Sequence, residues 1–201
     1  IAGKHTQFIY VAKDGDVLLD ERLPEGEVPK AHDVELTLRK VFDFATDTPL
    51  EEISFIREAK TLNQAASEQA LKGCYGHELG KTLSRPLGRG IMGDNIFSHI
   101  LSATSSACDA RMAGAMIPVM SNSGSGNQGI CATLPVVVFA EENHNTEEEL
   151  IRALMLSHLT AIYIKQSLGV LSALCGCVVA STGSSCGITY LMGGKYEQIS
   201  Y

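Results

Sequence analysis

The chain has 201 residues, of which 45% are hydrophobic and 19% charged, and its formal net charge at pH 7 is −7. This length and composition fit one globular domain, or one domain with an appendage, and exclude a disordered chain. The negative charge and the lack of any basic cluster argue against a nucleic-acid partner, because binding to a phosphate backbone depends on Lys and Arg.

No apolar run approaches the roughly 18 residues that span a bilayer, and the first residues, IAGKHTQ, lack the pattern of a signal peptide. We therefore expect a cytoplasmic protein without a membrane partner. Six cysteines are too few for a disulfide scaffold in a chain of this length, so we expect reduced thiols. Both ends interrupt a pattern, which indicates part of a longer polypeptide.

The first 45 residues predict a β-hairpin followed by a helix. TQFIYV (6–11) and VLLDER (17–22) are rich in β-branched and apolar residues, and KDGD between them contains the Asp-Gly of a tight turn. After a loop bracketed by two prolines, apolar residues fall on one helical face up to about residue 45. We assign residues 1–45 to the remnant of a small α/β domain.

Residues 46–201 predict a compact helical domain, so that the whole fold is mostly α. Thr48 as N-cap, Pro49 and Glu51 in capping-box spacing predict a helix that continues to about residue 73. Thr146 and Glu149 form a second capping box ahead of LIRALMLSHLTAIYIK, which is apolar on most faces and is expected at the centre of a helical layer. The apolar character after residue 79 favours an interface, either with another copy in a homo-oligomer or with segments that are missing from this chain.

An uncharged polar stretch, SNSGSGNQG (121–129), lies between apolar segments on both sides. Such a loop offers backbone N–H groups, hydroxyls and amides that suit the carboxylate or amine of a small polar ligand. The alternative is a Gly/Ser turn that lets helices approach closely. The candidate substrate-binding residues in this loop are Ser121, Asn122, Ser123, Ser125 and Asn127.

The glycines of this loop also spell G-x-G-x-x-G, the dinucleotide fingerprint. That fingerprint needs a strand before it, a helix after it and an acidic residue about twenty residues later. Pro118 in the preceding run and Pro135, which we expect to break a following helix, do not fit this context, and no Lys follows these glycines as it would in a P-loop.

Two further groups of residues could serve a site. Asp109 and Arg111 stand almost alone among small residues, which suggests either an ion pair or ligand role or simple surface exposure. His5, His77 and His158 are possible acid–base groups, and a structural histidine is the alternative for each.

Three cysteines lie within LCGCVVASTGSSC (174–186), and their spacing is not that of a zinc knuckle. Such thiols can pack as small apolar groups, or they can bind a soft metal or an iron–sulfur cluster.

Residues 104–141, with DARM and SNSGSGNQGI, and residues 152–175, ending in SALC, resemble the L-cysteine desulfidase family, which is related to the α-chain of iron–sulfur L-serine dehydratases. The resemblance implies a lyase that converts L-cysteine to pyruvate, ammonia and sulfide by β-elimination. An iron-dependent serine dehydratase is the near alternative, and a non-catalytic small-molecule binding or assembly module is an alternative of another class.

The resemblance also implies a [4Fe–4S] cluster held by three cysteines. Cys175 of SALC matches one cluster ligand, whereas Cys131, Cys177 and Cys186 match none. The other two ligands belong to family segments that this chain does not contain, so we expect the chain alone to be inactive. We choose His5 as the base that removes the Cα proton, and we expect Asp109 and Arg111 to act with the loop on an amino-acid substrate.

Overall fold

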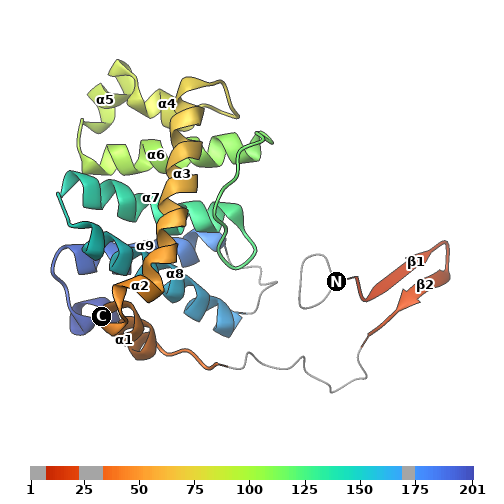
Figure 1. Ribbon diagram of the computed structural model, residues 1–201. Coiled ribbons are helices and arrows are strands. Elements are labelled where there is room, and N and C mark those ends of the chain that lie inside the picture. The colour runs from red at the N-terminus through yellow and green to blue at the C-terminus, as the bar shows by residue number, and fades with distance from the viewer. Residues whose placement is uncertain (1–7, 23–33, 169–174) are drawn as a thin grey trace.

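The computed structural model describes residues 8–22, 34–168 and 175–201. Figure 1 shows a short hairpin and a body of stacked helices. The elements are β1 (Tyr10–Lys13), β2 (Asp16–Asp20), α1 (Leu38–Asp47), α2 (Leu50–Ile53), the 3-10 turn η1 (Ser54–Ile56), α3 (Arg57–Lys72), α4 (Leu79–Ser84), α5 (Pro86–Met92), α6 (Ile96–Met112), α7 (Gly126–Glu142), α8 (Glu147–Leu168), α9 (Gly176–Leu191) and α10 (Tyr196–Ser200). The prediction of a mostly helical fold with a β-hairpin is confirmed.

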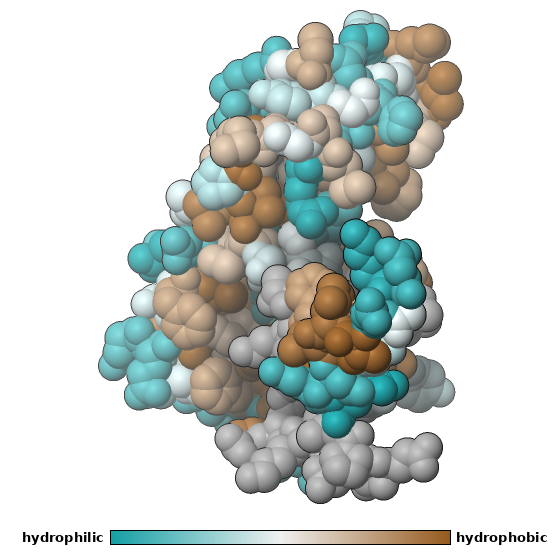
Figure 2. All heavy atoms as spheres, turned by 90° about the vertical axis from the view of Figure 1, so that its right-hand side faces the viewer, coloured by the Kyte–Doolittle hydropathy of each residue, from teal (hydrophilic) through white to brown (hydrophobic). Residues whose placement is uncertain are grey.

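The hairpin pairs β1 with β2 in antiparallel register, with an irregularity between Val11 and Ala12. Asp14 and Gly15 form its turn with φ angles of 53° and 96°, the positive values that a tight hairpin turn requires. Its apolar side chains stay largely exposed. Figure 2 shows the right-hand side of Figure 1, where the hairpin lies, and apolar residues are exposed there next to hydrophilic ones.

Helix α8 is central, as its sequence predicts, and packs against α1, α7 and α9. The predicted capping box at its start is confirmed: the Glu149 N–H donates to Thr146 Oγ1 (3.3 Å), and the Thr146 N–H donates to Glu149 Oε2 (2.7 Å). The main core includes Ile53, Ile151 and Leu154, each at most 1% exposed.

Helix α1 belongs to this core as well, because its Val41 and Ala45 are buried there. Arg152 of α8 donates to the carbonyls of Ala45 (3.2 Å) and Thr48 (3.1 Å), which fixes the end of α1 on the helical body. The division of the chain at residue 45 stays a prediction.

Three local predictions are wrong. Thr48 is not a helix N-cap, because α1 extends to Asp47 and the Thr48 N–H donates to the carbonyl of Phe44, while Pro49 precedes α2 without a side-chain cap. The predicted helix from Pro49 to residue 73 is divided by the turn η1. Pro135 also does not end a helix, since α7 continues through it to Glu142.

Helices α6, α7 and α9 are stacked in that order, and α3 crosses α6 and α7 (Figure 1). Helices α7 and α9 are therefore direct neighbours. Among the helices of residues 8–22, 34–168 and 175–201, none is long and apolar enough to cross a membrane.

Candidate functional site

The polar stretch 121–129 folds as a tight turn followed by a helix start. Asn122 and Ser125 exchange two backbone hydrogen bonds of 3.0 Å, and Ser123 and Gly124 between them have φ angles of 49° and 80°. The Ser125 hydroxyl accepts the N–H of Gln128 at 3.3 Å and caps α7. A helix thus does follow the glycine-rich stretch, and Gly126 and Gly129 are part of it.

Asn122 is directed into the protein and is only 4% exposed. Its Nδ2 donates to Nδ1 of His158 (3.2 Å) and to the His158 carbonyl (3.1 Å). Its Oδ1 accepts from Nε2 of Gln128 at 2.8 Å and from the Ser123 hydroxyl at 2.9 Å. The hydrogen-bonding capacity of this side chain is therefore used within the protein.

The partners of His158 define its tautomer. The Thr133 hydroxyl donates to the carbonyl of Gly129 (2.7 Å), so Nε2 of His158 must carry the proton in its 2.9 Å contact with Thr133 Oγ1. Nδ1 then accepts from Asn122. Burial lowers the pKa of His158 to about 4, so the imidazole is neutral near pH 7. These contacts give His158 a structural role.

Asn63 of α3 extends the same buried network. Its Nδ2 donates to Thr133 Oγ1 at 3.0 Å and to the carbonyl of Gly129 at 3.3 Å, while its Oδ1 accepts the N–H of Met120 at 2.8 Å. The chain entering the loop is thereby held against α3 and α7.

Close packing of two backbone segments requires a glycine at position 129. A Cβ atom at this position would lie 2.0 Å from the carbonyl oxygen of Met120 and 2.7 Å from Cα of Ser121. Only glycine fits such an approach of two backbone segments. The close-packing alternative therefore accounts for Gly129, while the exposed Ser121 and half-buried Asn127 remain accessible at the surface.

Asp109 and Arg111 lie near each other on α6 but have different partners. Asp109 Oδ2 accepts the N–H of Leu79 at 2.7 Å, at the start of α4. Arg111 Nη1 donates to Oδ1 of Asn127 at 3.1 Å, and a Cβ atom added to Gly126 would lie 2.2 Å from Arg111 Nε. The structure thus joins Arg111 to the start of α7, whereas Asp109 caps another helix.

Arg111 is exposed and forms no ion pair within the described part of the chain. A guanidinium group beside a helix N-terminus is suited to bind a carboxylate, because both favour negative charge and Arg can donate two parallel hydrogen bonds. The surface formed by Arg111 and the start of α7 therefore favours a negatively charged group.

Cys175 lies immediately before α9 and is exposed. Hydrogen bonds from the backbone N–H groups of Cys177 and Val178 lower the pKa of its thiol. Gly176 packs against the start of α7, since a Cβ atom there would lie 3.1 Å from Gln128 Oε1. Gln128 therefore connects the turn, through Asn122, with the helix end that carries Cys175.

The remaining candidate residues are less informative. His5 lies outside the described residues, and His77 is exposed on the segment between α3 and α4. Within residues 8–22, 34–168 and 175–201, no three His, Cys, Asp or Glu side chains are arranged to hold a metal ion.

Two cavities of about 230 Å³ lie away from Arg111, Cys175 and the polar turn. One is bordered by Arg57 and Lys60, which are already paired with Glu147 and Glu141. Among the residues that the structure describes, no predicted site residue borders either cavity.

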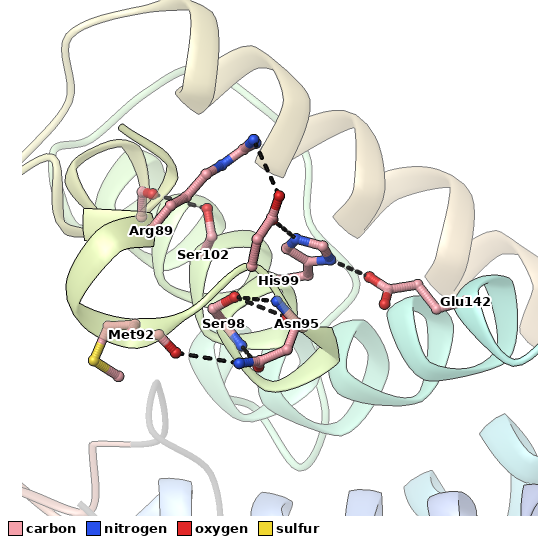
Figure 3. A network of polar contacts seen from close by, with 9 residues as sticks. Arg89, Met92, Asn95, Ser98, His99, Ser102 and Glu142 are labelled. Atoms are coloured by element: carbon pink, nitrogen blue, oxygen red, sulfur yellow. Dashed lines mark hydrogen bonds and ion pairs between the residues drawn. The ribbon is translucent and has the colours of Figure 1, made fainter. Parts of the chain in front are cut away.

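The second cavity adjoins the contacts drawn in Figure 3. His99 lies between two carboxylates: its Nε2 contacts Asp94 at 2.7 Å, and its Nδ1 contacts Glu142 at the end of α7. These carboxylates raise the pKa of His99. The network joins α5, α6 and α7, with Arg89 3.6 Å from Asp94.

Comparison with known proteins identifies the family. Residues 19–201 match the model described as serine dehydratase alpha chain. The chain is 69% identical over 201 residues to a UPF0597 protein of Bacteroides thetaiotaomicron and 70% identical over 202 residues to one of Phocaeicola vulgatus. A UPF0597 protein of Shewanella halifaxensis is 49% identical over 204 residues.

Each of these three matches covers 100% of the chain but 47% of the relative. The chain thus spans about half the length of these curated relatives. No solved structure matches it. The match to residues 19–201 includes the turn, Arg111 and Cys175, and the chain belongs to the serine dehydratase α-chain family.

Proposed function

We propose that this chain is part of a lyase that removes the thiol group of L-cysteine by β-elimination and yields pyruvate, ammonia and sulfide. The observation that carries the proposal is the position of Cys175 beside the polar turn, linked to it through Gly176, Gln128 and Asn122. Membership of the serine dehydratase α-chain family supports the same class of reaction.

The resemblance to cysteine desulfidases implies a [4Fe–4S] cluster, which when bound would supply an electrophilic iron that polarises the leaving group. Cys175 fits one ligand position, because it is exposed and its thiolate is favoured by the first N–H groups of α9. The described residues contain no complete metal-binding group. Further ligands would have to come from segments that this chain lacks.

The role that we assign to this chain's own residues is to bind and orient the substrate. Arg111 would pair with the substrate carboxylate, with the N–H groups at the start of α7 contributing to the same interaction. Asn127 holds the guanidinium group in place through its 3.1 Å hydrogen bond. The accessible hydroxyl group of Ser121 is available for the substrate amine. Fixing both groups would hold the substrate in one orientation for the elimination.

Buried residues of the turn would act indirectly. The side-chain amide of Asn122 is hydrogen-bonded to His158 and Gln128, so Asn122 would position the turn and not contact the substrate. His5 remains our choice for the base, as a prediction.

L-serine is the near alternative as substrate, because the same carboxylate and amine contacts serve both amino acids. A non-catalytic small-molecule binding or assembly module is the alternative of another class.

The test uses the full-length polypeptide that contains this chain, reconstituted anaerobically with iron and sulfide. We expect sulfide release from L-cysteine to exceed pyruvate formation from L-serine. The opposite order would favour the dehydratase, and no turnover of either by a reconstituted cluster would favour the binding module.

Arg111→Lys is the sharper test of substrate binding. It keeps the charge but removes the paired donors, so KM should rise about tenfold or more with the cluster absorbance unchanged. Arg89→Lys, at another exposed arginine outside the proposed site, is the control. Equal kinetics of both variants would remove Arg111 from the site.

A further inference from the structure

Four of the six cysteines form a row in which each thiol contacts the next, in the order Cys108, Cys131, Cys177 and Cys175. They belong to α6, to α7 and to the N-terminal end of α9. The Cys131 thiol contacts those of both Cys108 and Cys177, and Cys177 also contacts Cys175. Cys108 lies near the end of α6, Cys131 in the second turn of α7 and Cys177 in the first turn of α9. This arrangement is not needed for the proposed elimination reaction.

The helices that carry these thiols also pack on one another, α6 on α7 and α7 on α9. Cys108 packs against the apolar cluster that contains Ile130, the neighbour of Cys131. Gly176 lies against Gln128, which precedes Cys131 by about one helical turn. Cys108 and Cys131 are half-buried, whereas Cys177 is exposed.

We propose that Cys108 and Cys131 form a redox-active dithiol that closes to a disulfide by exchange with a low-molecular-weight disulfide. The bond would connect the end of α6 to the start of α7 and enclose residues 109–130. This enclosed segment contains the polar turn as well as Arg111 and Asn127. Oxidation would therefore restrain the segment that we assign to substrate binding, but formation of the bond does not depend on that assignment.

Cys108 is the better attacking thiol of the pair. The Cys131 thiol donates to it, and Arg111 lies nearby, and both lower the pKa of Cys108. The same contact and burial raise the pKa of Cys131. A thiol with a raised pKa suits the second step, because the small thiolate released in the first step can then accept its proton.

The thiol–disulfide exchange proceeds in two steps. First, the Cys108 thiolate attacks one sulfur of the small disulfide, which forms a mixed disulfide and releases one small thiolate. Second, the Cys131 thiol gives its proton to a small thiolate and attacks the Cys108 sulfur, which releases the second small thiolate. The two protein sulfurs lose two electrons, and the small disulfide is reduced to one thiol, which carries the Cys131 proton, and one thiolate.

The test treats the reduced 201-residue chain with oxidised glutathione in the presence of a metal chelator, followed by peptide mapping. We expect a Cys108–Cys131 crosslink, the loss of two titratable thiols, and a rise in Tm of about 5 to 10 °C that a reducing agent reverses. Glutathione bound only as mixed disulfides, or a crosslink between Cys131 and Cys177, would overturn the proposal.

Single serine variants separate the pair from the other thiols. Cys108→Ser and Cys131→Ser should each abolish the rise in Tm, whereas Cys177→Ser and the matched control Cys74→Ser, at an exposed cysteine outside the row, should retain it. Melting of each reduced variant verifies that it folds, and Cys108→Ala serves if the serine variant does not. A rise in Tm that persists without Cys108 would contradict the assignment. Since no readout is an activity, these outcomes are independent of the proposed lyase function.

Discussion

Replacing Asn122 by Ala should destabilise the fold much more than replacing Asn127, although both asparagines belong to the same polar stretch. Asn122→Ala removes the donor to His158 Nδ1 and the acceptor for Gln128 Nε2, and both groups are buried. A buried polar group left without a partner costs about 1 to 3 kcal/mol. Two such groups, together with the small cavity, give a loss of about 3 to 5 kcal/mol.

Urea denaturation followed by circular dichroism would measure this difference. For a chain of this size the loss corresponds to a decrease in Tm of about 10 °C. Asn127→Ala is the matched control: its amide is half-buried and contacts the exposed Arg111, so the expected change is below about 1 kcal/mol. If the two variants lost equal stability, the buried network would not be what holds the turn.

Two further predictions concern packing and pH. Gly129→Ala should cost about 3 kcal/mol or more, because its Cβ would meet the backbone at 2.0 Å, whereas Gly90→Ala, with nothing within 4 Å, should be neutral or slightly stabilising; similar midpoints in urea would refute this. His99→Gln should cost about 0.5 kcal/mol near pH 6, since exposed pairs contribute little. The pKa of His99 is raised by Asp94 and Glu142, so this stabilisation is complete below the pKa of the unfolded state and disappears as the pH rises through the folded one. A difference that grew with pH in urea titrations would contradict this sign.

Local signals predicted those elements whose contacts are close in sequence. Asp14 and Gly15 formed the expected hairpin turn, and Thr146 with Glu149 formed the expected cap. Pro135 misled us, because a proline within a helix usually costs about 3 kcal/mol. Helix α7 continues through it because its residues pack on four other helices, α3, α6, α8 and α9, an effect that no local pattern reveals.

The candidate site was predicted only in outline. Composition identified the polar stretch but could not show which of its amides is buried, since the partner of Asn122 is His158, 36 residues later. The same limit applies to the thiols: Cys108 and Cys131 lie at opposite ends of a long connection, and only the packing of α6 on α7 brings them together.

Cluster absorbance of Cys175→Ser tests the central claim most directly. In the full-length polypeptide, reconstituted anaerobically, we predict that this variant loses the iron–sulfur absorbance and the release of sulfide from L-cysteine, while Cys177→Ser, two residues later at the same helix end, retains both. Retention of the cluster by Cys175→Ser, or equal loss in both variants, would contradict the account.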